Sequence, residues 1–249
     1  MLFDNKKLDK TVPIPLYFQL KELILDEIKK EHYKDGDMIP TENEISEEFQ
    51  ISRTTVRQAI TELVQEGWLY RVKSKGTFVT HPKIKQDFLR KLESFKDQME
   101  RLGMKPSTQL MELRREKADE EVAKALNIAE GAEVIYLFRK RFADGEPIVT
   151  IQTYLPFDQC SFIMGHDLEK EPLYEILSEK EETKILKVKR KIEAVEADEE
   201  DAQLLDMEKG KPVQYFHSVG FTSEDVALEY SRARYRGDRS SFEITVLTE

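Results

Sequence analysis

The sequence contains a single cysteine, no excess of basic residues, and no apolar run of the roughly 20 residues that a transmembrane helix needs. One cysteine, Cys160, excludes an intramolecular disulfide, and none of the four histidines lies at a metal-ligand spacing to it or to another histidine. We therefore expect no metal site and no cofactor. The first eight residues lack the apolar core of a signal peptide. With 39% hydrophobic residues and a formal net charge of −10, the composition is typical of a globular protein, which we expect in the cytoplasm without a membrane partner.

Helical periodicity marks three helices near the amino terminus. The first follows an apolar stripe over residues 14–31. Thr41 and Glu44 have the S/T-x-x-E spacing of a capping box, which predicts the start of a second, short helix. A third apolar stripe covers residues 52–67, where Gly67 is typical of a helix end. The pattern predicts a helix-turn-helix.

A β-hairpin and a linker are predicted after the third helix. Residues 68–72 and 77–80 are rich in aromatic and β-branched residues and flank a basic turn that contains a glycine. Residues 81–86 are polar, contain a proline and lack a period. We therefore predict a first domain at residues 13–81 and a linker at residues 82–90.

The remaining residues, 91–249, mix strand and helix patterns and predict an α+β domain. An amphipathic helix is expected over residues 88–102. Strands are expected over residues 108–114, 134–142, 148–155, 185–197, 213–221, 226–235 and 242–247, with short helices near 119–126, 173–179 and 198–207. Asp144 and Gly145 join two of these strands closely enough for a hairpin, so at least part of the sheet should be antiparallel.

Polar side chains of DNA-reading types occupy the open face of the third helix, most of them in its first two turns. They are Arg53, Thr54, Thr55, Arg57, Gln58 and Thr61. Residues 52–85 hold seven basic and two acidic residues, although the whole chain is acidic. Binding to DNA through this one local patch is therefore predicted. The alternative is that Arg53 and Arg57 form surface pairs with neighbouring acids.

Three motifs resemble the winged helix-turn-helix of GntR-family bacterial transcription regulators: PTENEI at residues 40–45, SRTTVRQAI at 52–60 and KGTFV at 75–79. The resemblance covers residues 15–79 and implies that the recognition helix contacts operator DNA while the wing enters the minor groove. The DNA-binding residues predicted in this way are Thr41, Arg53, Thr54, Thr55, Arg57, Lys73, Lys75, Gly76 and Thr77.

Two arginines in the second domain predict a site for a small anion. Strand alternation places Arg139 and Arg141 on one face together with apolar residues, about 7 Å apart. Because burying an unpaired charge is costly, both guanidinium groups need an anionic partner. A phosphate or carboxylate ligand would serve, and so would an internal salt bridge to Glu229 or Asp238.

Residues 92–247 resemble the UTRA effector-binding domain of the HutC subfamily of GntR regulators, which has a chorismate-lyase-like α+β fold. The matching motifs are LESF at 92–95, RKR at 139–141, YLP at 154–156, GKPV at 210–213 and YRGDR at 235–239. The resemblance implies an antiparallel sheet with flanking helices. It also implies the effector-binding residues Ser94, Phe95, Arg139, Arg141, Tyr174, Glu229 and Tyr235.

Two positions of this chain depart from the pattern of that domain. Relatives commonly have Ser-Leu-Tyr where this chain has Pro172 before Leu173, and an acidic residue where it has Ile151. Proline cannot donate a hydrogen bond and isoleucine cannot bind a hydroxyl group. The departures predict a less polar ligand, or a sugar phosphate different from the one that amino-sugar regulators recognise.

Together the two resemblances imply a sequence-specific transcription regulator, a repressor of a carbohydrate or related catabolic operon. We expect a homodimer on double-stranded operator DNA, controlled by a small phosphorylated metabolite such as a sugar phosphate. The alternative is a lyase-like enzyme that uses the second domain. No nucleophile–base pair, metal-ligand set or phosphate-binding glycine loop is visible in the sequence, so we expect no enzyme.

Overall fold

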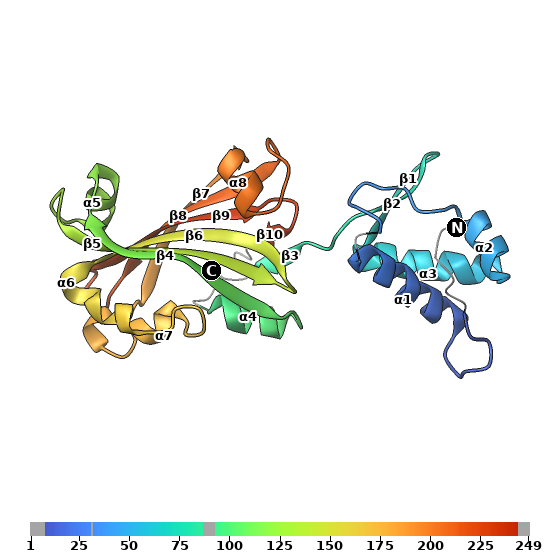
Figure 1. Cartoon of the computed structure of the whole chain (residues 1–249), viewed down its shortest axis with the longest axis horizontal. Helices are drawn as coiled ribbons and strands as arrows, with labels where there is room; N and C mark the ends of the chain where they lie inside the picture. The colour runs from blue at the N-terminus through green and yellow to red at the C-terminus, as the bar shows by residue number, and fades with distance from the viewer. Residues whose placement is uncertain (1–7, 31, 87–92, 244–249) are drawn as a thin grey trace, which may run out of the picture. The chain divides into compact units, whose positions relative to one another are not determined.

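The computed structural model describes residues 8–30, 32–86 and 93–243. The chain forms two compact units, Met1–Lys83 and Ile84–Glu249, coloured blue to cyan and cyan to red in Figure 1. Each unit has hydrophobic clusters of its own, so each is built around its own core.

The first unit is a helix-turn-helix followed by a two-stranded wing, as the periodicity predicts. Its elements are α1 (Leu16–Lys29), α2 (Glu42–Phe49), α3 (Arg53–Gln65), β1 (Leu69–Val72) and β2 (Gly76–Val79). The strands of the wing are antiparallel. The apolar stripes of all three helices meet in one buried cluster that also includes the first residue of β1 and the last of β2.

Side-chain caps set the starts of α2 and α3. The predicted capping box is confirmed: the backbone N–H of Glu44 donates to the Thr41 hydroxyl at 3.3 Å, and the backbone N–H of Thr41 donates to the Glu44 carboxylate at 2.7 Å. Ser52 caps α3 by accepting from the backbone N–H of Thr55 at 3.1 Å. The Ser52 cap thereby fixes the first turn of α3, the helix that carries the predicted DNA-reading side chains.

The second unit is built on a six-stranded sheet in which all neighbouring strands are antiparallel, in the order β4-β5-β6-β9-β8-β7. The strands are β4 (Pro106–Lys117), β5 (Glu133–Ala143), β6 (Glu146–Pro156), β7 (Lys187–Glu196), β8 (Pro212–Phe221) and β9 (Ala227–Arg236). The predicted hairpin joins β5 to β6, and both turn residues, Asp144 and Gly145, have positive φ angles of 52° and 85°.

Helices cover both faces of the sheet (Figure 1). One face carries α4 (Phe95–Arg101), α6 (Phe157–Cys160) and α7 (Leu173–Leu177), together with the short 3-10 helices η1 (Ser161–Gly165) and η2 (Glu181–Thr183). The other carries α5 (Glu120–Leu126), which packs on tyrosines of β5, β6 and β9, and α8 (Glu199–Leu204). The pocket described below lies on the face of α4 and α7.

The structure differs from the predicted elements in three places. Ile84–Gln86, expected in the linker, form strand β3, which pairs in parallel with β10 (Ser240–Phe242). The helix expected over residues 88–102 begins only at Phe95, and residues 87–92 lie outside the described residues. Of the strand expected over residues 242–247, Phe242 is the one described residue that lies in a strand, as the last residue of β10. Residues 244–249 lie outside the described residues. α6 and η1 were not predicted.

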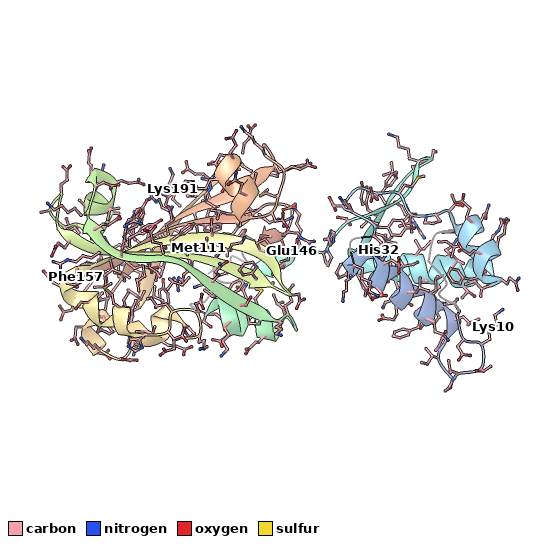
Figure 2. All side chains as sticks on the ribbon, in the orientation of Figure 1. Lys10, His32, Met111, Glu146, Phe157 and Lys191 are labelled. Carbon is pink, nitrogen blue, oxygen red and sulfur yellow. The ribbon has the colours of Figure 1, made fainter. Side chains whose placement is uncertain are left out.

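Charged side chains hold the turn between β9 and β10. Glu146, labelled in Figure 2, accepts from Arg239 Nε at 2.6 Å and from Arg236 Nη1 at 3.1 Å. Between these arginines, the backbone N–H of Gly237 donates to the carbonyl oxygen of Pro212 at 3.0 Å. The close approach leaves no room for a side chain at position 237.

Gly237→Ala should therefore destabilise the second unit. The added Cβ would lie 2.6 Å from the backbone oxygen of Pro212, so one backbone segment has to move, at a cost of about 1–3 kcal/mol. The matched control is Gly165→Ala, where an added Cβ meets no atom within 4 Å. Thermal unfolding of the full chain checks this, and equal midpoints for the two variants would show the prediction to be wrong.

Candidate functional site

The open face of α3 carries the predicted DNA-reading side chains. Arg53, Thr54 and Arg57 are exposed, whereas Thr55 is half-buried, and its hydroxyl lies 2.8 Å from that of the capping Ser52. Val56, two residues after Thr54, faces the core with no exposed surface. The Ser52 cap and the buried apolar residues of α3 therefore determine which face of the helix is exposed. The polar residues lie on that face.

Glu42, the first residue of α2, connects that helix to α3 and to the wing. Arg57 Nε donates to its carboxylate at 2.9 Å, and Arg71 Nη2 lies 3.4 Å from the other carboxylate oxygen. Arg71 also donates to Thr61 Oγ1 at 3.1 Å. For Arg57, the surface pair that we left open as the alternative is therefore present. Such exposed pairs contribute about 0–1 kcal/mol, so a DNA phosphate can replace the carboxylate.

The wing presents its basic residues on a tight turn. Lys73 and Lys75 are exposed, and the turn requires positive φ angles at Ser74 and Gly76, of 63° and 142°. A Cβ at Gly76 would lie 3.0 Å from the sulfur of Met38. Thr77 follows on β2, opposite Arg71. The predicted wing residues therefore share one turn, while Thr41 uses its hydroxyl in the cap of α2.

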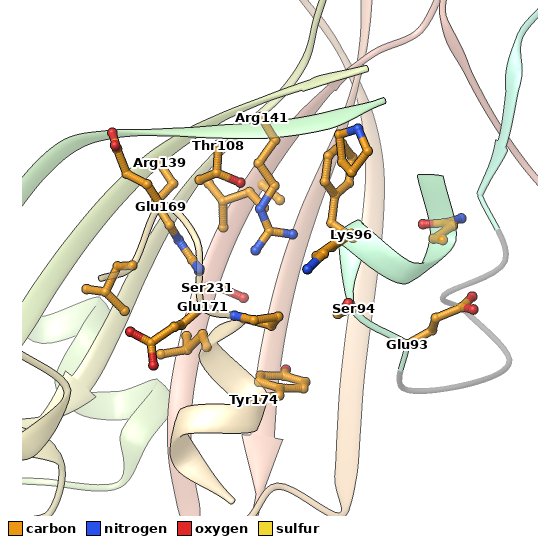
Figure 3. Close-up of a pocket in the computed structure, with 18 of the residues that line it drawn as sticks. Glu93, Ser94, Lys96, Thr108, Arg139, Arg141, Glu169, Glu171, Tyr174 and Ser231 are labelled. Atoms are coloured by element: carbon orange, nitrogen blue, oxygen red, sulfur yellow. The ribbon is translucent and has the colours of Figure 1, made fainter. Parts of the chain in front are cut away.

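A cavity of about 730 Å³ lies in the second unit, within the usual range for a small-molecule site. Residues from α4, α7 and strands β4 to β9 line it, as the close-up in Figure 3 shows for part of the wall. All seven residues predicted to bind the effector are among them: Ser94, Phe95, Arg139, Arg141, Tyr174, Glu229 and Tyr235.

Arg139 and Arg141 point into this cavity from β5 (Figure 3). Arg139 is 3% exposed, and the Nε atoms of both arginines are buried without a hydrogen-bond partner in the described part of the chain. Burial, together with the charge of Arg141, lowers the pKa of Arg139 to about 9, and burial lowers the pKa of Arg141 as well. The Arg141 guanidinium lies 5.3 Å from the centre of the Phe95 ring.

The two carboxylates considered in the sequence as internal partners of these arginines are engaged elsewhere. Asp238 forms an ion pair with Arg236 at 2.8 Å. Glu229 is 4% exposed and accepts from the Tyr174 hydroxyl at 2.5 Å. Within residues 8–30, 32–86 and 93–243, neither Arg139 nor Arg141 forms an ion pair, so the internal salt bridge that we considered is absent there.

The aromatic and hydroxyl groups of the pocket are held by their own contacts. Burial and the neighbouring Glu229 raise the pKa of Tyr174 well above its usual value, so its hydroxyl stays protonated and donates. Burial also raises the pKa of Tyr235. Ser94 caps α4 by accepting from the backbone N–H of Asp97 at 3.1 Å, and its hydroxyl donates to the Asp97 carboxylate at 2.8 Å.

Many other residues on the cavity wall were not predicted from the sequence, among them three polar residues of the far strands. Arg190 on β7, Ser218 on β8 and Ser231 on β9 all line it. Alternation within each strand identifies the face on which a residue lies, but the alignment of β7 with β8 and β9 depends on a pairing register that sequence periodicity does not give.

Comparisons with known proteins agree with both units. Residues 16–79 match the model of the bacterial regulatory proteins of the gntR family, and residues 101–241 match the UTRA domain. The HTH-type transcriptional repressor NagR of Bacillus subtilis is 32% identical over 94% of this chain and 96% of its own length. The chain belongs to the HutC subfamily of the GntR-family transcription regulators. The resemblance seen in the sequence is thereby confirmed.

A second curated relative and a solved structure also resemble this GntR-family chain over most of its length. The probable fructoselysine utilization operon transcriptional repressor of Escherichia coli K12 is 29% identical over 92% of this chain and 93% of its own length. The crystal structure of PhnF from Mycobacterium smegmatis is 28% identical in sequence to this chain. The match covers 91% of this chain and 98% of the PhnF chain, with a TM-score of 0.68. The α+β fold is confirmed, and NagR and the fructoselysine utilization repressor are named as transcriptional repressors, not as enzymes.

No described helix is both long and apolar enough to cross a membrane. Among the same residues, no cluster of three or more His, Cys, Asp or Glu side chains could hold a metal ion.

Arg139→Met should stabilise the ligand-free protein. The substitution removes a buried charge that has no carboxylate partner among the described residues and keeps most of the side-chain volume, so we expect a gain of about 1–4 kcal/mol in the free energy of unfolding. Urea unfolding measures it. The control is Lys140→Met on the same strand, where the lysine lies over the Phe142 ring and does not line the cavity. A less stable Arg139→Met variant would contradict this electrostatic interpretation.

Proposed function

We propose that this regulator represses a carbohydrate or related catabolic operon and that a sugar phosphate bound in the cavity changes its affinity for operator DNA. The observation that carries the proposal is the pair of buried guanidinium groups that face the cavity without a carboxylate partner in the described residues. A phosphate group would accept charge-assisted hydrogen bonds from both. The relative named as a fructoselysine utilization repressor supports the carbohydrate class.

The rest of the proposed effector site suits a sugar. The buried carboxylate of Glu229 can accept from ligand hydroxyl groups while it holds Tyr174 in place. Phe95, Ile151 and Phe216 provide apolar walls, against which the C–H face of a sugar can pack. Ser94, Phe95, Arg139, Arg141, Tyr174, Glu229 and Tyr235 are the effector-binding residues in this proposal.

In the first unit, we propose that Thr41, Arg53, Thr54, Thr55 and Arg57 contact bases and phosphates in the major groove, with Lys73, Lys75, Gly76 and Thr77 in the minor groove. A homodimer would place two such units on a palindromic operator, with half-sites about one helical turn apart. Arg57 would exchange its pair with Glu42 for a contact with DNA.

The connection between the two sites would run through α4 and β3. Ser94 and Phe95 line the cavity at the start of α4, and β3 precedes that helix in the chain. β3 pairs with β10, and beside this pair the backbone N–H of Ile84 donates to the carbonyl oxygen of Arg239 at 2.7 Å. β10 follows β9, the strand that carries Tyr235. A ligand that repositions Phe95 or Tyr235 can thereby favour one arrangement of the DNA-binding units.

Two variants should separate the two activities. We expect Arg57→Ala to abolish specific DNA binding and leave ligand binding intact, and Arg139→Met to leave DNA binding intact and abolish the response to ligand. Fluorescence anisotropy on DNA from upstream of the protein's own gene, at fixed salt with and without a panel of sugar phosphates, measures both. Lys30→Ala, an exposed basic residue of the same unit, is the control for Arg57.

The outcomes distinguish the parts of the proposal. Specific DNA binding that no sugar phosphate shifts would keep the regulator and refute the phosphate site. Loss of both activities in both variants would indicate misfolding instead of two separate sites.

A further inference from the structure

The start of helix α4 forms one wall of the cavity. Its first residue, Phe95, contacts Arg141 of β5, whose guanidinium carbon lies 5.3 Å from the ring centre. Lys96 is the next residue, and Figure 3 shows its side chain pointing from α4 into the cavity, toward Arg141. Three cationic side chains from two elements therefore face the same part of the cavity: Lys96 from α4, and Arg139 and Arg141 from β5.

The ammonium group of Lys96 is available to a ligand. Lys96 is exposed, and among the described residues its side chain forms no hydrogen bond and no ion pair. Two acidic residues close to it in the chain have other partners. Glu93 pairs with Arg101 at 3.0 Å. The Asp97 carboxylate accepts from the Ser94 hydroxyl at 2.8 Å. The lysine can therefore bind an anion without first breaking a contact in the described part of the protein.

The hydroxyl of Ser94, by contrast, cannot donate to a phosphate while it caps α4. Its proton goes to the Asp97 carboxylate, and its oxygen accepts from the backbone N–H of Asp97 at 3.1 Å. A fully ionised phosphate only accepts hydrogen bonds, so it needs donors around it. Ser94 can still accept from a ligand hydroxyl group, whereas Lys96 supplies three N–H donors and a charge on the same wall.

Lys96 differs from the two arginines in the ligand-free protein. The arginine Nε atoms are buried in place, whereas the ammonium group of an exposed lysine stays hydrated on a flexible stem and can turn away from other positive charges. A phosphate monoester has three terminal oxygens and a charge of about −2, enough to accept from Arg139, Arg141 and Lys96 together. Binding of such a group would draw the lysine, and α4 with it, toward β5.

We propose, on the basis of the proposed function, that Lys96 is a further effector-binding residue, whose ammonium group binds the same phosphate that Arg139 and Arg141 bind from β5. The bound phosphate thereby connects α4 to β5. Strand β3 precedes α4 in the chain and follows the DNA-binding unit. The contact of Lys96 with the phosphate therefore contributes to the change in operator affinity as well as to ligand affinity.

Inorganic phosphate is the probe for this contact, because it has the charged group without a sugar. Isothermal titration calorimetry of the full chain at constant ionic strength measures its affinity. We expect Lys96→Met to weaken phosphate binding roughly 10-fold, the lower end of the range for a hydrogen bond to a charged group. Lys96→Arg keeps the charge and should retain most of the affinity.

Lys124→Met is the matched control for the loss of charge. Lys124 is an exposed residue of helix α5, lies outside the cavity wall, and has no side-chain partner among the described residues. Its removal changes the net charge of the chain by the same amount and should leave the phosphate affinity unchanged. Thermal unfolding without phosphate checks that both variants fold.

A second readout tests the connection to DNA binding. The ligand is the sugar phosphate that shifts operator binding of the unchanged protein, added at a concentration that saturates each variant. We expect Lys96→Met to show a smaller shift in operator affinity, because the phosphate no longer holds α4. Lys124→Met should show the full shift. A full shift in saturated Lys96→Met would overturn the contribution of Lys96 to operator affinity.

The remaining outcomes separate this contact from the proposed phosphate site. Unchanged phosphate affinity in Lys96→Met, or an equal loss in Lys124→Met, would overturn the role of Lys96. If Arg139→Met still abolished phosphate binding, the proposed phosphate site would stand. Failure of the unchanged protein to bind phosphate at millimolar concentration, or binding that Arg139→Met leaves unchanged, would overturn the role of Lys96 and the phosphate site together.

Discussion

A guanidinium group inside a protein is costly unless an anion accompanies it, and the second unit buries two of them on one strand. The alternation of β5 requires Arg139 and Arg141 to share a face, and the carboxylates of Glu229 and Asp238 are engaged with Tyr174 and Arg236. We therefore expect these two buried charges to lower the free energy of unfolding of the ligand-free protein. In the proposed function, an anion that binds there would recover that stability, which would couple ligand binding to the packing around the cavity.

In the first unit, by contrast, two arginines are paired with a carboxylate and are partly or largely exposed. The pairs of Glu42 with Arg57 and Arg71 are formed by side chains that are partly or largely exposed, where water keeps ion pairs weak. In the proposed function they would orient two arginines at little energetic cost and release them when a DNA phosphate competes. The net charge of −10 opposes nonspecific attraction to DNA, so in the proposed function binding would depend on this local patch and on base contacts.

Local sequence patterns were sufficient for much of the fold. The capping box of Thr41 and Glu44, the Asp144-Gly145 hairpin and the shared face of Arg139 and Arg141 follow from spacings of a few residues, and the structure contains all three. That Arg139 and Arg141 share a cavity with Tyr174 and Glu229 came from the family resemblance, since neither spacing nor alternation relates α7 to β5.

Contacts between distant segments were not predictable in the same way. β3 has three residues and a parallel partner more than 150 positions later, so it resembled a linker. Glu42 pairs with residues 15 and 29 positions away, which the local helix pattern does not reveal. Arg190 and Ser218 were missed because the sheet order places β7 and β8 beyond β9, so their neighbours depend on long-range register.

The most direct test of the account observes the two buried arginines themselves. In protein labelled with 15N arginine, the Nε–H resonances of Arg139 and Arg141 can be assigned from their single substitutions and followed as a sugar phosphate that alters operator binding is added. We expect both resonances to shift and their exchange with water to slow, because each Nε–H gains an acceptor, while the resonance of Arg57 stays in place. A sugar phosphate that alters operator binding and leaves both resonances unchanged would contradict the account.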